Sequence, residues 1–445
     1  MKKISIYILV FLLSVGLMGG CGNSGGDSAS TGSKAISTVS GESKSAAESQ
    51  PAAGEVIKIG CMVPYSGGSS HFGQSLIKGY EHAFEDFMKH YGDTLNGNTV
   101  ELVYGDTAGV PDTAVTELER MISVEKVSAV IGTYNSGPAA AMAPLCIKNK
   151  IPFQVTTCVS DLILAEPNSY VFRANTGDTD TRAYWDMFLD HLVELTGEPL
   201  ESLAIIYDNS DFGHSASTML KGLCTEKGMK IAFDEAITTD SADLSSVINK
   251  IKDVNADFLI SILYVNDSLL FVRQAKEFDL ETPIFGYGAG MLTEEFLQQS
   301  GELSNYIVLC SQYFYDESLL SEEAIEYQQR YMKEINSKNV NENYPNGWMG
   351  MYSLLEAIAR AGSGDRDAIA AELAKTDIKK GERALMMMPS FEGIKYEDFK
   401  GRYNQNIYSA FQFSQIMDGT YKIIFPVPAS GKSPIVFPPP KWSER

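Results

Sequence analysis

Short apolar runs alternate with amphipathic stretches along most of the chain. The run Val56–Val63 predicts a buried strand, and Leu76, Tyr80 and Phe87 after it recur at the spacing of one helix face. This alternation continues to about residue 175 and restarts near residue 202. It is typical of parallel sheets with helices on both faces, so two runs of it predict two doubly wound α/β lobes. The expected strands are Val56–Val63, Val100–Tyr104, Val127–Ile131, Ile151–Thr156, Ser202–Tyr207, Met229–Phe233, Ala256–Leu263 and Pro283–Phe285.

The chain after residue 305 holds too few elements for a third core. It offers a strand at Tyr306–Gln312, helices near 322–333 and 349–361, and a hairpin whose two-residue turn is Asp418-Gly419. We expect these pieces to complete the two lobes, with about three chain crossings that form a hinge. Lobe 1 would comprise 55–175 and about 306–385, lobe 2 would comprise 176–305 and about 386–430, and 431–445 would form a C-terminal tail.

The N-terminus has the pattern of an export signal. Lys2 and Lys3 precede the apolar run Ile4–Leu17, which is shorter than a membrane span, and small residues follow. Because a cysteine comes next, residues 1–20 resemble a bacterial lipoprotein signal, which implies lipidation of Cys21; an ordinary cleaved signal followed by an incidental cysteine is the alternative. Residues 21–54, rich in Ser, Gly and Ala, predict a flexible tether. We therefore expect an extracytoplasmic protein that contacts the membrane only through a lipid anchor.

Charge excludes nucleic acid as a partner, and the cysteine count excludes a disulfide scaffold. The chain of 445 residues has 36 Lys and Arg against 57 Asp and Glu, a formal charge of −21. Such an acidic chain lacks the basic surface of a nucleic-acid binder. Its six cysteines are too few for a disulfide framework, although a Cys146–Cys158 bond remains open.

The motifs that could carry catalysis are incomplete. Gly431-Lys432-Ser433 lacks the glycine that a phosphate loop needs five residues earlier, and Gly286–Gly290 lacks the spacing of a dinucleotide fingerprint. The five histidines are scattered, with no metal-ligand spacing. We therefore expect a binding protein with no enzymatic activity, no cofactor and no metal.

The loops after the strands are the expected binding region, because ligands of open parallel sheets lie at the carboxyl ends of the strands. In Thr133–Pro138, Pro138 suits a first helical position and Gly137 a cap, which leaves Ser136 beside free N–H groups. Such donors at a helix start can hold a carboxylate without Lys or Arg. The alternative is that Ser136 only caps its helix.

Several short motifs follow one another along the chain: Ile57-Lys58-Ile59-Gly60, Pro64-Tyr65-Ser66-Gly67-Gly68, Phe72-Gly73-Gln74, Ala129-Val130-Ile131-Gly132, Ile151-Pro152-Phe153, Tyr170-Val171-Phe172-Arg173 and Asp208–Gly213. Their order is that of one protein family. Over about residues 55–426 the chain resembles the branched-chain amino-acid (Leu/Ile/Val) substrate-binding proteins of ABC transporters. The resemblance implies a type I periplasmic-binding-protein fold, two lobes that close on a small ligand like a hinged trap, no catalysis, and docking on a membrane permease.

The same resemblance implies a set of ligand-binding residues. Ser136 matches the family serine that binds the ligand carboxylate. Thr157, Cys158 and Val159 match a stretch that holds carboxylate and amine; Val159 replaces a family threonine, whose bond Thr157 could supply. The matching aromatic wall residues are Phe72, Phe212 and Tyr264.

Gly288 departs from the family pattern, because relatives that bind amino acids carry an acidic residue there for the ligand ammonium. Asp211 or Asp267 could substitute for it, since burial of an ammonium without a counter-charge is costly. The expected ligand is a branched-chain or other hydrophobic amino acid. A receptor for an amide, a urea-like compound or an aromatic acid, and a sensory ligand-binding module, are the alternatives.

Overall fold

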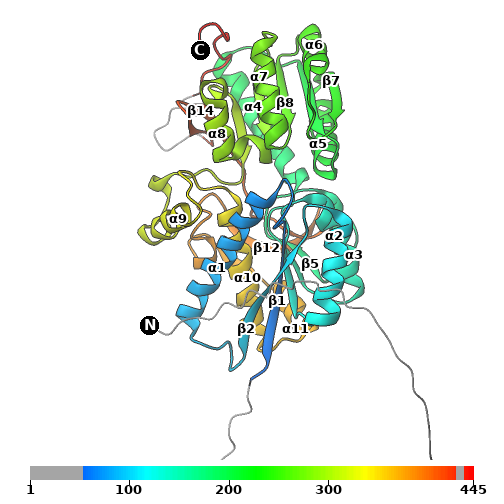
Figure 1. Ribbon diagram of the computed structural model, residues 1–445, viewed down its shortest axis with the longest axis vertical. Coiled ribbons are helices and arrows are strands. Elements are labelled where there is room, and N and C mark those ends of the chain that lie inside the picture. Colours follow the sequence, from blue (N-terminus) through cyan, green and yellow to red (C-terminus); the bar gives the residue numbers. More distant parts are fainter. Residues whose placement is uncertain (1–53, 427–434) are drawn as a thin grey trace, which may run out of the picture. The chain divides into compact units, whose positions relative to one another are not determined.

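Two separate β-sheets organise the chain (Figure 1). The computed structural model describes residues 54–426 and 435–445, so the expected signal peptide, Cys21 and almost all of the tether lie outside the described residues, as do 427–434. The first sheet has eight strands in the order β11-β12-β13-β5-β4-β3-β1-β2, and the second has seven in the order β15-β14-β10-β9-β8-β6-β7. We call the first sheet with its helices lobe 1 and the second sheet with its helices lobe 2.

The first sheet is parallel at its centre and antiparallel at one edge. β1 pairs in parallel with β2 and β3, and its side chains alternate between two apolar clusters: Ile59 and Cys61 face one, and Met62 faces the other. Helices therefore cover both faces. The strands are β1 (Val56–Val63), β2 (Thr99–Asp106), β3 (Ala129–Gly132), β4 (Phe153–Val155), β5 (Val171–Arg173), β11 (Asp377–Lys379), β12 (Gly393–Phe399) and β13 (Arg402–Asn406).

The second sheet repeats this plan and ends in the expected hairpin. Asp418 and Gly419 both have positive φ, 51° and 69°, as a tight two-residue turn between antiparallel strands requires. β10 joins this sheet by pairing with β9 on one side and β14 on the other. The strands are β6 (Ser202–Asp208), β7 (Lys230–Ile237), β8 (Phe258–Ile262), β9 (Ile284–Tyr287), β10 (Val308–Ser311), β14 (Gln412–Met417) and β15 (Thr420–Phe425).

Helices pack on both faces of each sheet, and α1 lies along α10 (Figure 1). No helix in the described ranges has the length and apolar character needed to cross a membrane. The helices are α1 (Ser70–Tyr91), α2 (Pro111–Arg120), α3 (Ser136–Lys148), α4 (Asp178–Thr196), α5 (Asp211–Lys227), α6 (Ser245–Val254), α7 (Val265–Glu277), α8 (Glu294–Ser300), α9 (Glu322–Glu334), α10 (Asn343–Ala361) and α11 (Arg366–Leu373).

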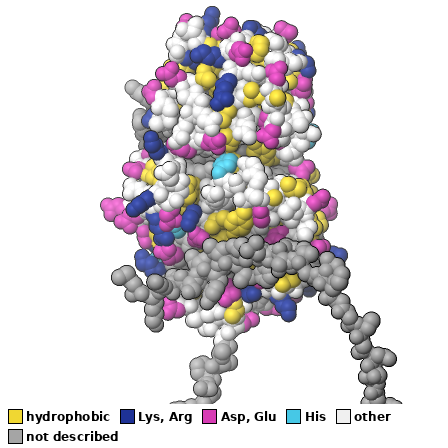
Figure 2. Space-filling model, viewed as in Figure 1, with side chains coloured by type: hydrophobic (Ala, Val, Ile, Leu, Met, Phe, Trp, Pro, Cys, Tyr) yellow, Lys and Arg dark blue, Asp and Glu magenta, His cyan; other side chains and the backbone are white. Residues whose placement is uncertain are grey.

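Acidic and basic side chains are interspersed on the face that Figure 2 shows. Ion pairs join such side chains: Arg330 pairs with Glu85 at 3.0 Å and with Glu334 at 2.8 Å. The acidic excess on this face is therefore spread out, with basic partners between the carboxylates.

The expected fold class is confirmed, but the expected lobe boundaries need correction. The chain passes between the sheets three times, after β5, β10 and β13. β10 therefore belongs to lobe 2, although 306–385 was expected in lobe 1, and β12 and β13 belong to lobe 1, although 386–430 was expected in lobe 2. The alternation of apolar and polar residues predicts strands but does not specify which distant strand each one pairs with.

Candidate ligand-binding site

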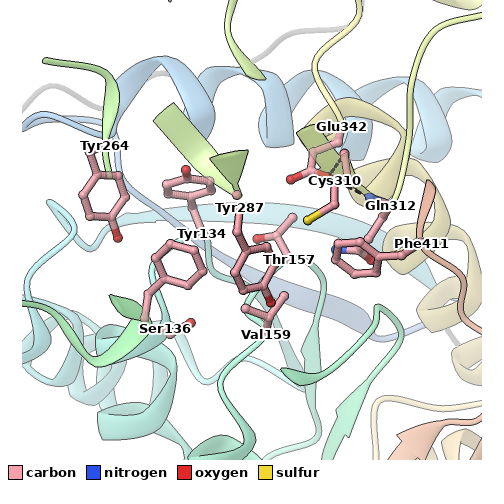
Figure 3. A pocket seen from close by; sticks show the side chains of 13 residues that line it. Tyr134, Ser136, Thr157, Val159, Tyr264, Tyr287, Cys310, Gln312, Glu342 and Phe411 are labelled. Atoms are coloured by element: carbon pink, nitrogen blue, oxygen red, sulfur yellow. Dashed lines mark hydrogen bonds between the residues drawn. The ribbon is translucent and has the colours of Figure 1, made fainter. Parts of the chain in front are cut away.

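A cavity of ≈ 40 Å³ lies where loops and strand ends of both lobes converge (Figure 3). Residues that follow β3 and β4 line it from lobe 1, and residues at or after the ends of β8, β9 and β10 line it from lobe 2. Six of the eight ligand-binding residues expected from the sequence are among the lining: Ser136, Thr157, Val159, Phe212, Tyr264 and Gly288.

Ser136 occupies the first position of α3, two residues before Pro138, where the sequence placed the start of the helix. Gly137 and Pro138 therefore lie inside the first turn. Asn135 is the N-cap, and its side chain makes no capping hydrogen bond. The Asn135 Nδ2 donates instead to the Ser69 hydroxyl at 3.1 Å and to the Tyr264 hydroxyl, across the lobes, at 3.4 Å. Because the Asn135 side chain does not cap the helix and Pro138 has no N–H, the N–H groups of Ser136 and Gly137 are the donors available to an anion.

Thr157 and Cys158 both bind the loop that leads into α3. The Thr157 Oγ1 donates to the Thr133 carbonyl at 2.7 Å, and the Cys158 thiol donates to the same carbonyl at 2.8 Å. Cys158 is buried, and burial raises the pKa of its thiol to about 12. Thr157 and Val159 line the cavity, whereas Cys158 does not. Cys146 and Cys158 are both free, as are the other three cysteines in the described part of the chain.

Aromatic rings form much of the cavity wall. Tyr134, Phe212, Tyr264, Tyr287 and Phe411 contribute to the lining. The expected wall residue Phe72 lies one layer behind, where its ring stacks on Tyr134 with 4.1 Å between centroids.

The Phe212 ring leaves no room for a side chain at position 288, which is therefore glycine. Its φ is 73°, and a Cβ at this position would lie 2.6 Å from the Phe212 Cζ. An acidic side chain at 288 therefore cannot be accommodated while Phe212 keeps this position. Neither expected substitute lines the cavity: Asp211 is exposed at the start of α5, and the Asp267 carboxylate accepts the Asp240 and Ser241 N–H groups at 3.0 Å.

The acidic residue that does line the cavity is Glu342, which precedes α10. Its carboxylate accepts a hydrogen bond from the Ser311 hydroxyl and one from the Gln312 N–H, at 3.2 Å for the latter. Burial raises the pKa of Glu342. Sequence reasoning did not single out this residue, because it belongs to no strand end and only the chain crossing after β10 brings it to the cavity.

The sequence also contained a signal for three further lining residues that were not singled out. Cys310, Ser311 and Gln312 lie at the carboxyl end of an expected strand, which is the signal that could have found them. Phe411 lies in the last crossing between the lobes, and Tyr134 and Tyr287 adjoin residues that were singled out.

Comparison with known proteins places the fold among binding proteins. A family model described as periplasmic binding protein matches residues 56–410. The Leu/Ile/Val-binding protein homolog 7 of Brucella suis biovar 1 is 27% identical over 384 residues, which cover 83% of this chain and 91% of that protein.

Two solved structures share the fold. The leucine-binding protein LivK of Thermotoga maritima has a TM-score of 0.70 at 23% identity, covering 82% of this chain and 97% of that one. A solute-binding protein of an ABC transporter from R. palustris, in complex with benzoate, has a TM-score of 0.68 at 20% identity, covering 83% of this chain and 95% of that one.

Proposed function

Because this chain belongs to the periplasmic binding protein family, we propose that it is an extracytoplasmic solute receptor for an ABC permease. It captures a small carboxylate, a branched-chain or other hydrophobic amino acid, between its two lobes. It carries no catalytic step. Cys21, lipidated after removal of residues 1–20, would hold the receptor beside the membrane.

One observation carries this proposal: a single cavity draws its lining from both lobes and combines aromatic walls with the start of α3. The uncapped N–H groups beside Ser136 suit the carboxylate of a ligand. The rings suit an apolar body, since burial of apolar surface supplies the main favourable free energy.

A receptor for aromatic acids is the second candidate. The five aromatic side chains in the lining favour a flat ring as ligand, and a structural neighbour was solved with benzoate. The two candidates differ in the ligand's amine, which an aromatic acid such as benzoate lacks.

A thermal-shift screen of the purified chain tests the proposal. The panel contains the twenty amino acids, simple amides, urea and aromatic carboxylates. A ligand present at one hundred times its Kd should stabilise the protein by about 2.7 kcal/mol, a shift that is readily seen. A panel in which no carboxylate shifts the unfolding midpoint would rule out both candidates.

A further inference from the structure

Glu342 is the one acidic side chain among the described residues that line the cavity, and no Lys, Arg or His lines it beside Glu342. Both of its side-chain hydrogen bonds, from Ser311 and from Gln312, end on Oε2. The other oxygen, Oε1, receives no hydrogen bond from any residue in 54–426 or 435–445. Half of this carboxylate is thus free to receive a donor from a ligand.

A half-buried carboxylate without a cation beside it is an unfavourable arrangement. Removal of a charged group from water costs several kcal/mol unless an opposite charge or hydrogen bonds compensate. Two neutral donors on Oε2 compensate only in part. A cationic group inside the cavity would supply the missing compensation, and the lining contains none of its own.

The aromatic wall favours the same kind of ligand. Tyr134, Tyr264 and Tyr287 line the cavity together with Phe212 and Phe411. Ring faces attract an ammonium group, and the attraction grows when the cation is removed from water. The hydroxyl of Tyr134 is buried and has no hydrogen-bond partner in the described part of the chain, so it offers one more acceptor.

The two charged ends of such a ligand would occupy different ends of the cavity. In Figure 3, Glu342 lies with Gln312 at one end, whereas Ser136 and Tyr264 lie at the other. The start of α3 beside Ser136 suits an anion, and the Glu342 end suits a cation.

We propose that Glu342 selects for an amine: the ligand is a small acid whose carboxylate binds beside Ser136 and whose protonated amine, remote from that carboxylate, binds Glu342 Oε1 within the aromatic wall. This inference rests on the proposed function, a receptor for a small carboxylate, but replaces the branched-chain amino acid by an acid whose amine is remote from the carboxylate. It also explains how the cavity can hold an amine although residue 288 is glycine.

Calorimetric titration with matched pairs tests the inference. The pairs are 5-aminopentanoate with hexanoate, 4-(aminomethyl)benzoate with 4-methylbenzoate, and L-leucine with 4-methylpentanoate. The wild-type protein should bind the first member of at least one of the first two pairs about tenfold or more tightly than its amine-free partner. Glu342→Gln should remove most of that preference and leave the affinity for the amine-free acid within about twofold to threefold.

Glu356→Gln is the matched control, because Glu356 is a half-buried glutamate like Glu342, lies on α10 and is outside this cavity. It should leave the amine preference unchanged. An equal loss for both members of a pair in Glu342→Gln would assign Glu342 a structural role through Ser311 and overturn the inference. Equal wild-type affinity within every pair would also overturn it, and a preference confined to leucine would overturn the remote placement of the amine. If no acid binds the wild-type protein, the proposed function itself fails.

Discussion

At the scale of single residues, the structure separates two serines that look alike in the sequence. Ser136 lies at the first position of α3 and makes no cap, whereas Ser321 caps α9, accepting the Ala324 N–H at 3.2 Å. A serine that lines a cavity without a helix-capping bond is free to serve a ligand.

Ser136→Ala should therefore weaken binding of the ligand found in the screen by about 1–3 kcal/mol, because a hydrogen bond to a charged carboxylate is lost. The unfolding midpoint of the ligand-free protein should stay nearly unchanged. Ser321→Ala provides the contrast: it should lower stability by about 1 kcal/mol and leave binding intact. Titration calorimetry and thermal unfolding of both variants check this, and a loss of stability in Ser136→Ala equal to that in Ser321→Ala would make Ser136 structural.

Asp178, at the start of α4, is a buried acid outside the cavity lining. It accepts hydrogen bonds from the Tyr287 hydroxyl at 2.9 Å and from the Ser215 hydroxyl. Burial, aided by the negative charge of Asp161, raises the pKa of Asp178 from 3.8 to about 7. The folded state therefore holds a proton that the unfolded state has already released at intermediate pH.

Because the folded-state pKa is the higher one, Asp178 should reduce stability as pH rises from about 4 to about 7, and the loss should level off above that range. The whole loss is on the order of 4 kcal/mol, given 1.36 kcal/mol per pH unit. Asp178→Asn should flatten this part of the stability profile, measured by denaturant unfolding at several pH values. Parallel profiles for the two proteins would show that Asp178 is ionised in the folded state.

At the scale of the elements, α1 and α10 approach so closely that glycine is required at their contact. A Cβ at Gly79 would lie 2.4 Å from the Tyr344 carbonyl oxygen and 2.9 Å from the Gly347 Cα. Both obstacles are backbone atoms, so the helices must separate to admit a side chain.

Gly79→Ala should lower the free energy of unfolding by about 1–3 kcal/mol, although alanine favours helix over glycine. Gly222→Ala in α5 is the control, because a Cβ there would meet only the Arg182 Nη1, the end of a flexible side chain, at 2.9 Å. That variant should keep or slightly raise stability. Denaturant unfolding of both variants measures the difference, and equal stability of the two would mean that α1 and α10 can shift apart at little cost.

The elements also show where sequence reasoning succeeds. Each strand from β1 to β4 and from β6 to β9 is a local apolar run flanked by a helix, so its position could be predicted within a few residues. The strands β11, β12 and β13 were missed. β11 pairs with β12, and β12 forms a hairpin with β13, so only the pairing of β13 with β5 joins distant parts of the chain. The residues of β12 are buried only near its start and include Lys395, Glu397 and Asp398, so the sequence gives no clear alternation of apolar and polar positions.

The candidate site shows the same division. Ser136, Thr157 and Tyr264 follow expected strands of parallel sheets, where a binding loop could be predicted from topology alone. Glu342 and Phe411 lie in segments that connect the lobes. Their place at the cavity depends on how the two sheets share the chain, which no local pattern encodes.

At the scale of the whole molecule, the cavity sets a condition on ligand entry. The cavity has a volume of ≈ 40 Å³. By the same kind of measure a single water molecule needs roughly 10–15 Å³, so the cavity has room for only a few waters. Leucine, with nine non-hydrogen atoms, needs far more room than this. The lobes or the aromatic side chains must therefore move before a ligand can enter, and the three crossings between the sheets form the hinge about which lobes can turn.

We therefore expect the ligand-free protein in solution to populate forms whose lobes are further apart, and saturating ligand to reduce the radius of gyration measured by small-angle X-ray scattering. Ligand shifts this equilibrium only as far as it binds the closed form more tightly. Ser136→Ala should bind the same ligand more weakly. At saturation its radius of gyration should fall as far as that of the wild type, but the ligand concentration needed should be proportionally higher, because the variant changes affinity and not the closed form. A radius of gyration that stays constant up to saturation would mean that only side chains move on binding. The permease would then have to recognise the ligand-bound receptor by something other than the angle between the lobes.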